Sequence, residues 1–152
     1  MSDSIPVVTL RTATLNDVPQ ILALERESPH AAHWTAPQYQ KLVGAGIVLV
    51  AEVAGRLCGF VCAQALASEW EIENVLVADR SLRMGIGSVL VQELVKRAQR
   101  ARISAIRLEV RDSNVPARQL YEKHGFRKVG QRRNYYADPA EDAILYDFRL
   151  SR

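Results

Sequence analysis

The sequence predicts an α/β fold in which one mixed sheet of about seven strands carries helices on both faces. Segments of strand and helical hydrophobic period alternate along the 152 residues in the order β-α-α-β-β-β-α-β-α-β-β. No internal repeat, low-complexity tract or Pro/Gly/Ser-rich linker divides the chain, and its length suits one core. We therefore expect a single domain over residues 1–152, with residues 1–6 flexible.

The first half of the chain is predicted to supply four strands and two helices. A helix begins at the N-cap Thr14 and runs to about Ser28, and a shorter helix ends at Gly44. A hairpin turns at Ala54-Gly55. The predicted strands are Val7–Arg11, Ile47–Val53, Leu57–Leu66 and Trp70–Ala78, a loop covers Pro29–Trp34, and the short helix lies near Pro37–Val43.

The second half is predicted to contain two helices and three strands. Apolar residues recur at helical spacing from Gly87 to Arg100, and Ala105–Val110 alternates like a strand. Asn114 precedes a helix from Val115 to about His124. Two further strands close the chain, at Phe126–Tyr135 and Ala143–Leu150.

Composition narrows the class of protein. The net charge is only +3, but arginines concentrate in the second half, which suits a phosphorylated cofactor, RNA or simply a solvated basic face. No recognition helix or aromatic RNA-binding motif accompanies them. No apolar run approaches the roughly 20 residues that span a membrane, and no secretory signal is present, so a cytoplasmic protein is expected.

The cysteines and histidines predict neither a disulfide nor a metal site. In a strand, Cys58 and Cys62 would share one face but lie too far apart to bond, so buried free thiols are expected in a reducing compartment. The histidines and cysteines show no metal-ligand spacing.

The run from Asp79 to Ser88 joins a Val-rich strand to an amphipathic helix and contains Gly85 and Gly87. Backbone N–H groups at a glycine-opened helix N-terminus can close on a phosphate. The run lacks the Gly-Lys-Ser/Thr of a P-loop and the third glycine of a dinucleotide fingerprint. What remains is an arginine-bearing loop whose backbone amides could hold a pyrophosphate, and a purely structural Gly-x-Gly loop is the alternative.

Two later motifs carry a family resemblance. They are Leu108-Glu109-Val110-Arg111-Asp112-Ser113-Asn114 and Leu120-Tyr121-Glu122-Lys123-His124-Gly125-Phe126. With the glycine loop, they resemble the GNAT family of acetyl-CoA-dependent N-acetyltransferases over nearly the whole chain. Arg132-Arg133-Asn134-Tyr135-Tyr136 and Glu141-Asp142-Ala143 are similar to the bacterial ribosomal-protein-alanine N-acetyltransferases of that family. The resemblance implies a GNAT-like fold with a mixed, mostly antiparallel sheet of about seven strands and about four helices.

The resemblance also implies residue roles. Glu109 would be the general base and Tyr121 the general acid, with Asn114 contacting acetyl-CoA. The remaining cofactor residues would be Val75, Leu76 and Val77 for the pantetheine arm, and Arg83, Met84, Gly85, Ile86, Gly87 and Ser88 for the pyrophosphate. The chain departs from the family at Leu82, where Gln or Arg is usual, and at His33-Trp34-Thr35 before the second helix.

The acceptor side leaves alternatives open. Arg107 and Arg111 flank Glu109 on one strand face, which would weaken it as a base or make it part of a surface ion-pair ladder. Glu71 and Glu73 are rival bases, or they bind the incoming ammonium, and Tyr136 is a candidate acceptor contact. Tyr121 could instead be a structural tyrosine.

The predicted reaction is acetyl transfer from acetyl-CoA to the α-amine of a protein N-terminus, most specifically the alanine of a small-subunit ribosomal protein. An α-amine, with a pKa near 7.8, costs about 1 kcal/mol to deprotonate at pH 7, against about 4.6 for lysine. The resemblance implies that both substrates bind and that the amine attacks directly, without an acetyl-enzyme. Acetylation of lysine or a small amine, and a non-catalytic acetyl-CoA- or RNA-binding module, are the alternatives. Neither nucleic acid nor a membrane is required as a partner, and oligomeric state is not predicted.

Overall fold

A computed structural model of the chain describes residues 7–28, 33–82 and 84–150. The predicted flexibility of residues 1–6 and the predicted role of Arg83 lie outside these ranges. Among the described residues, no helix combines the length and apolar character needed to cross a membrane.

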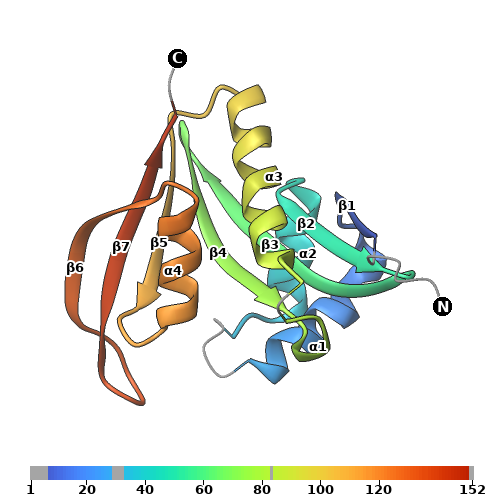
Figure 1. The fold of residues 1–152 in the computed structure, drawn as a ribbon, viewed down its shortest axis with the longest axis horizontal. Coiled ribbons are helices and arrows are strands. Elements are labelled where there is room, and N and C mark those ends of the chain that lie inside the picture. Colours follow the sequence, from blue (N-terminus) through green and yellow to red (C-terminus); the bar gives the residue numbers. More distant parts are fainter. Residues whose placement is uncertain (1–6, 29–32, 83, 151–152) are drawn as a thin grey trace.

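The predicted succession of strands and helices is confirmed (Figure 1). The strands are β1 (Val8–Thr12), β2 (Val48–Val53), β3 (Arg56–Leu66), β4 (Glu69–Val77), β5 (Ala105–Arg111), β6 (Arg127–Tyr136) and β7 (Glu141–Arg149). The α-helices are α1 (Val18–Glu27), α2 (Ala36–Gly44), α3 (Ile86–Arg100) and α4 (Val115–Lys123), and short 3₁₀ turns cover η1 (Leu15–Asp17) and η2 (Asp79–Ser81).

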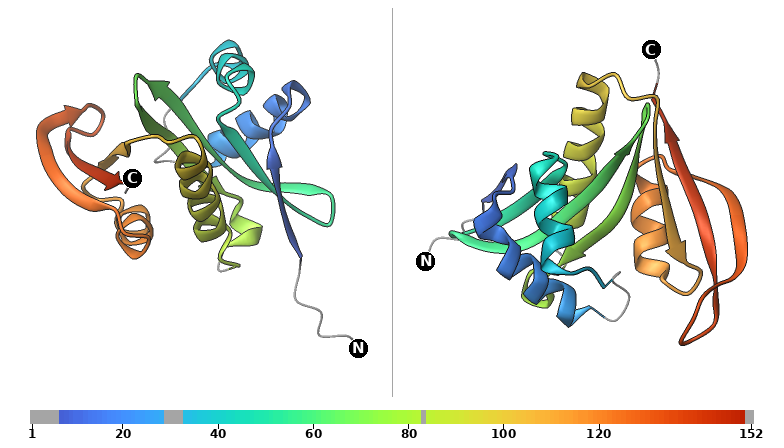
Figure 2. Two further views of the ribbon diagram at one scale, coloured as in Figure 1. Left: turned by 90° about the horizontal axis from the view of Figure 1, so that it is seen from above. Right: turned by 180° about the vertical axis from the view of Figure 1, so that it is seen from behind.

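The strands form one sheet in the order β1-β2-β3-β4-β5-β7-β6. Neighbouring strands are antiparallel except β4 and β5, which are parallel and connected through α3. The mixed, mostly antiparallel sheet is therefore as expected, and so are the four α-helices that the described residues form around it. Helices α3 and α4 cover one face and α1 and α2 the other (Figure 2).

Each face of the sheet buries its own apolar cluster. Ile86, Leu90 and Leu94 of α3 pack with one set of strand side chains, together with Tyr121 of α4. Ile21 of α1 belongs to the opposite cluster, which also contains side chains of α2. A helix with one apolar stripe is stable only when that stripe is buried, and here each stripe meets one face of the sheet.

The parallel pair β4/β5 is hydrogen-bonded over only part of its length. The pairing runs from Glu69↔Ala105 to Ile72↔Leu108, whereas β4 continues to Val77 and β5 to Arg111. Beyond Ile72 the two strands therefore separate, and the ends of both line a cavity.

Two β-bulges change which way side chains face. Cys62 pairs with Asn74 and Ala63 with Ile72, so Glu73 is an extra residue on β4. Likewise, Gly59 pairs with Ala51 and Leu57 with Glu52, which leaves Cys58 extra on β3. The expectation that Cys58 and Cys62 share a face is wrong, because this bulge sends Cys58 into the α3-side cluster and Cys62 into the α1/α2-side cluster. Both are buried free thiols, as predicted.

The first α-helix begins later than the sequence suggests. Thr14 opens the 3₁₀ turn η1, and α1 starts at Val18 with Pro19 in its first turn. Proline fits there because the first turn needs no intrahelical N–H donor.

Gly59 lets α3 approach the sheet closely. A Cβ at this position would lie 2.9 Å from the carbonyl oxygen of Leu76 and 3.0 Å from Cγ2 of Ile86. We expect Gly59→Ala to lower the free energy of unfolding by about 1–3 kcal/mol, the usual cost of overpacking, as measured by urea denaturation. Gly44→Ala is the matched control, because a Cβ there meets nothing within 4 Å. Equal midpoints for the two variants would contradict this packing.

Candidate active site

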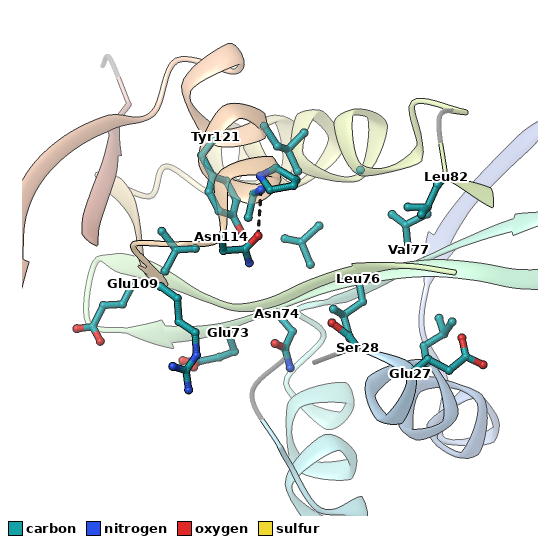
Figure 3. A pocket seen from close by; sticks show the side chains of 18 of the residues that line it. Glu27, Ser28, Glu73, Asn74, Leu76, Val77, Leu82, Glu109, Asn114 and Tyr121 are labelled. Atoms are coloured by element: carbon teal, nitrogen blue, oxygen red, sulfur yellow. Dashed lines mark hydrogen bonds between the residues drawn. The ribbon is translucent and has the colours of Figure 1, made fainter. Parts of the chain in front are cut away.

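A cavity of about 660 Å³ opens where β4 and β5 separate (Figure 3). One end is lined by Val77, Leu82 and Gly87, beside the start of α3. The other end carries the carboxylates of Glu73 and Glu109. Tyr121 and Asn114 lie between α4 and β4, along the wall that joins the two ends.

The end of the cavity near α3 has the geometry expected of a phosphate cradle. Gly85 is the N-cap of α3 and has the left-handed φ of 72° that favours glycine. It has no side chain to cap the first turn, where N–H groups and the helix dipole favour an anion. A Cβ at Gly87 would lie only 3.3 Å from Cδ2 of Leu120, so a larger residue would crowd this end. Ile86 is buried, Met84 is exposed and Ser88 is half-buried.

The departure at Leu82 lies at the same end. Its side chain is 56% exposed and lines the cavity near Val77. An apolar side chain there contributes no positive charge, so the groups at this end that favour an anion are the backbone N–H groups of the α3 N-terminus.

Val75, Leu76 and Val77 form the middle of the β4 wall. They keep their pairing with β3, as in Val77↔Gly59, while the pairing of β4 with β5 has already ended. One backbone edge of this segment is therefore turned toward the cavity. An extended edge of this kind can pair with an amide-bearing chain.

Asn114 and Tyr121 come from the two ends of α4. Asn114 is the N-cap, and its Oδ1 accepts a hydrogen bond from the Ala117 N–H at 3.4 Å. Tyr121 is buried, and its ring lies 5.6 Å from that of Phe126 and 6.3 Å from that of Tyr146. Burial raises the pKa of Tyr121 above its usual value, so its phenol keeps its proton.

The carboxylate end contains two of the three predicted acidic residues. Glu73 accepts a hydrogen bond from Nε2 of Gln64 at 2.8 Å. Burial, reinforced by the negative charges of Glu71 and Glu109, raises the pKa of Glu73 to about 7. Glu71 instead borders a separate hollow of about 110 Å³ and is not among the described residues that line the main cavity.

Glu109 is paired with an arginine that the sequence did not indicate. The two flanking arginines form other ion pairs, Arg107 with Glu69 at 3.7 Å and Arg111 with Glu141 at 3.3 Å. The partner of Glu109 is Arg132 of β6, at 3.5 Å. Strand β7 lies between them, and Ala143 pairs with both Arg111 and Arg132. The contact thus depends on the order of strands in the sheet.

The tyrosine pair at the end of β6 reaches the site. Tyr136 lines the cavity, with the guanidinium of Arg111 4.3 Å from its ring centre, and burial raises its pKa to about 12. The pKa of Tyr135 is raised chiefly by its interaction with the Glu109 carboxylate.

Sequence reasoning missed the cavity wall contributed by α1, whereas it singled out the segment before α2 as a departure from the family. Leu24, Glu27, Ser28 and His33 line the cavity opposite α4. Behind them, Glu25 is buried and accepts a hydrogen bond from the hydroxyl of Tyr39. The sequence feature that could have indicated this wall is the His33-Trp34-Thr35 segment, where the chain departs from the family. In the described part of the chain, no group of three or more His, Cys, Asp or Glu side chains could hold a metal ion.

Comparison with known proteins agrees with this geometry. Residues 15–126 match the model of the Acetyltransferase (GNAT) family. The Escherichia coli K12 [ribosomal protein bS18]-alanine N-acetyltransferase is 29% identical over 146 residues, which are 94% of this chain and 98% of that protein. An N-alpha-acetyltransferase of Sulfurisphaera tokodaii is 32% identical over 151 residues, covering 90% of this chain and 89% of that protein.

A solved structure shares the fold as well. The crystal structure of the Escherichia coli ribosomal-protein-S18-alanine N-acetyltransferase superposes with a TM-score of 0.87 at 28% identity, covering 96% of each chain. The family match spans most of the chain and includes both walls of the cavity. The chain therefore belongs to the Acetyltransferase (GNAT) family.

Proposed function

We propose that this protein transfers an acetyl group from acetyl-CoA to the α-amine of a protein N-terminus, with the N-terminal alanine of a small-subunit ribosomal protein as its first candidate substrate. One observation carries the proposal. A single cavity places the Glu73 and Glu109 carboxylates and the Tyr121 phenol along the path that leads from the glycine-opened start of α3. The names of the bacterial and archaeal relatives support an N-terminal acceptor.

The donor fits the end of the cavity near α3. When bound, acetyl-CoA supplies a thioester carbonyl that an amine can attack. The N-terminus of α3 and the backbone from Met84 to Ser88 suit its pyrophosphate, and the β4 edge at Val75–Val77 suits its amide-bearing arm. Asn114 lines the opposite wall. This assignment requires no metal, because amide formation from a thioester needs only an amine, a base and an acid.

A carboxylate and a phenol can divide the proton transfers. We assign the base to Glu109, which would accept the proton of the incoming ammonium directly or through water. Tyr121 would protonate the departing thiolate, a role for which a buried and protonated phenol is suited. An ammonium nitrogen loses two protons on becoming an amide nitrogen, and the base accepts the first of them before attack. The nitrogen–carbonyl bond then forms as the carbon–sulfur bond breaks, Tyr121 gives its proton to the leaving sulfur, and the second nitrogen proton restores the Tyr121 phenol.

Glu73 is the second candidate for the base, and a specific observation favours it. Its pKa of about 7 matches the pH at which a general base works best, and it lines the same cavity end. Glu109, by contrast, is engaged by Arg132. The carboxylate that is not the base would hold the ammonium before transfer.

Tyr121→Phe keeps the ring and removes the hydroxyl. We expect turnover to fall by about two orders of magnitude or more, because the leaving thiolate loses its proton donor. The affinity for acetyl-CoA, measured by calorimetry, should stay nearly the same. Unchanged turnover would remove Tyr121 as the acid and leave it a structural tyrosine.

The two carboxylates can be separated by matched substitutions. We expect Glu109→Gln to lower kcat/KM about a hundredfold and most strongly at acid pH, where the acceptor amine carries a proton. Glu73→Gln should have the smaller effect. The carboxyl group of Glu73 becomes a carboxylate only above its pKa of about 7. If the pH profile of kcat/KM for the wild type has an inflection near pH 7 and Glu73→Gln abolishes it, that inflection reports the ionisation of Glu73. The reverse ranking of the two variants would assign the base to Glu73.

A peptide panel tests the acceptor. We expect incubation with acetyl-CoA to add one acetyl group to the N-terminus of a peptide copying a ribosomal N-terminal alanine, as read by intact mass. A matched peptide with a blocked N-terminus and a free lysine should stay unmodified, because lysine costs more to deprotonate. Modification of lysine peptides or small amines alone would refute the N-terminal assignment, and modification of no amine would refute the enzymatic function.

A further inference from the structure

A buried carboxylate lies behind the α1 wall of the cavity. Glu25 of α1 is only 4% exposed. One of its oxygens, Oε1, accepts a hydrogen bond from the backbone N–H of Trp34 at 2.9 Å, and the other, Oε2, accepts one from the hydroxyl of Tyr39. Among the ion pairs of the described residues, its partner is the exposed His33, with Nδ1 3.9 Å from Oε1. A buried carboxylate without a close cation is costly, so its neutral donors must hold it.

Tyr39 of α2 joins this carboxylate to the sheet. It is fully buried, and burial holds its pKa above the usual range, so its hydroxyl donates to Glu25. The same hydroxyl accepts a hydrogen bond from Nδ2 of Asn74 on β4 at 3.0 Å. The ring lies 5.9 Å from both Trp34 and Phe60. Hydrogen bonds therefore run without a break from the backbone before α2, through α1 and α2, to β4.

Both ends of this hydrogen-bonded chain reach the cavity. Asn74 lines it and directly follows the bulge residue Glu73, so the position of Asn74 constrains that of the Glu73 carboxylate (Figure 3). At the other end, Leu24 and His33 line the cavity, and they are the residues immediately before Glu25 and Trp34 in the sequence. Asn74 lies beside Glu73, so the Asn74 end of the hydrogen-bonded chain is at the carboxylate end of the cavity (Figure 3).

We infer that Glu25, Tyr39 and Asn74 act as a positioning unit that holds the α1 wall and the Glu73 bulge at the separation that an acceptor amine requires. The inference rests on the proposed function, since it assigns the carboxylate end to the acceptor. It goes beyond that function by naming three residues that contribute to acceptor binding indirectly, because their hydrogen bonds fix the positions of α1 and β4 on the two sides of the cavity.

Tyr39→Phe tests the unit with the least change of volume. We expect the KM for the acceptor peptide to rise about tenfold, as expected for the loss of one or two hydrogen bonds, while the KM for acetyl-CoA stays within twofold. Asn74→Leu is the second variant, because it removes the link to β4 and leaves Tyr39 on Glu25. It should show the same selective rise.

Asp17→Asn is the matched control. Asp17 is also a buried carboxylate near α1, and it accepts hydrogen bonds from the Thr14 N–H at 2.7 Å and from Arg11 at 2.7 and 2.8 Å. It is not among the described residues that line the cavity. Its loss should lower the melting temperature without separating the two KM values.

Three results overturn the inference in different ways. If Tyr39→Phe and Asn74→Leu leave the KM values for peptide and acetyl-CoA unchanged, the unit is structural only. The same conclusion holds if both variants raise the two KM values equally, because a loss of stability does not distinguish the two substrates. If wild type acetylates peptides but the acetyl-CoA KM alone responds, the carboxylate end is not the acceptor end. If the wild-type protein acetylates no amine, the proposed function itself fails. This outcome is distinguishable from the other two, because it is observed without any variant.

Discussion

The early end of the β4/β5 pairing is the constraint on which the site depends. Two parallel strands that stay hydrogen-bonded leave no backbone edge exposed and no space between them. Here the ladder stops at Ile72↔Leu108, and the last residues of both strands become walls. The bulge at Glu73 lies just beyond the last pair, so the strand bends where the pairing ends. Helix α3, which connects the two strands, begins at the same opening and brings its N-terminus to the cavity.

The cavity is electrostatically polarised along its length. Its α3 end offers the partial positive charge of a helix N-terminus, which suits a phosphorylated donor. Its far end gathers Glu73 and Glu109, which suit an ammonium, and their proximity contributes to the raised pKa of Glu73. Arg132 partly neutralises this end from β6. In the proposed reaction the donor carries negative phosphates and the acceptor a positive ammonium. Each substrate is therefore opposite in charge to the end of the cavity that it would occupy.

Particular residues show where sequence reasoning succeeds and where it stops. Local patterns predicted that a glycine loop opens α3 and that Asn114 caps α4, because helix starts depend on residues a few positions apart; that Gly85 is the N-cap of α3 came from the structure. The same reasoning placed Cys58 and Cys62 on one face of the strand, which is wrong because one extra residue in a strand reverses every side chain beyond it. It also named Arg107 and Arg111 as neighbours of Glu109, when the ion pair is made by Arg132, two strands away.

The sequence by itself determined the class of the fold, the order of its elements and the glycine-opened loop before α3, because hydrophobic period, caps and turns are local properties. Motif resemblance added the candidate acid and base. Only the tertiary structure decided that Glu73, and not Glu71, shares the cavity with Glu109, and that Tyr39 joins Glu25 to Asn74. Those facts depend on the register of paired strands and on helices packed from distant parts of the chain. Long-range contacts of this kind leave no periodic signal along the sequence.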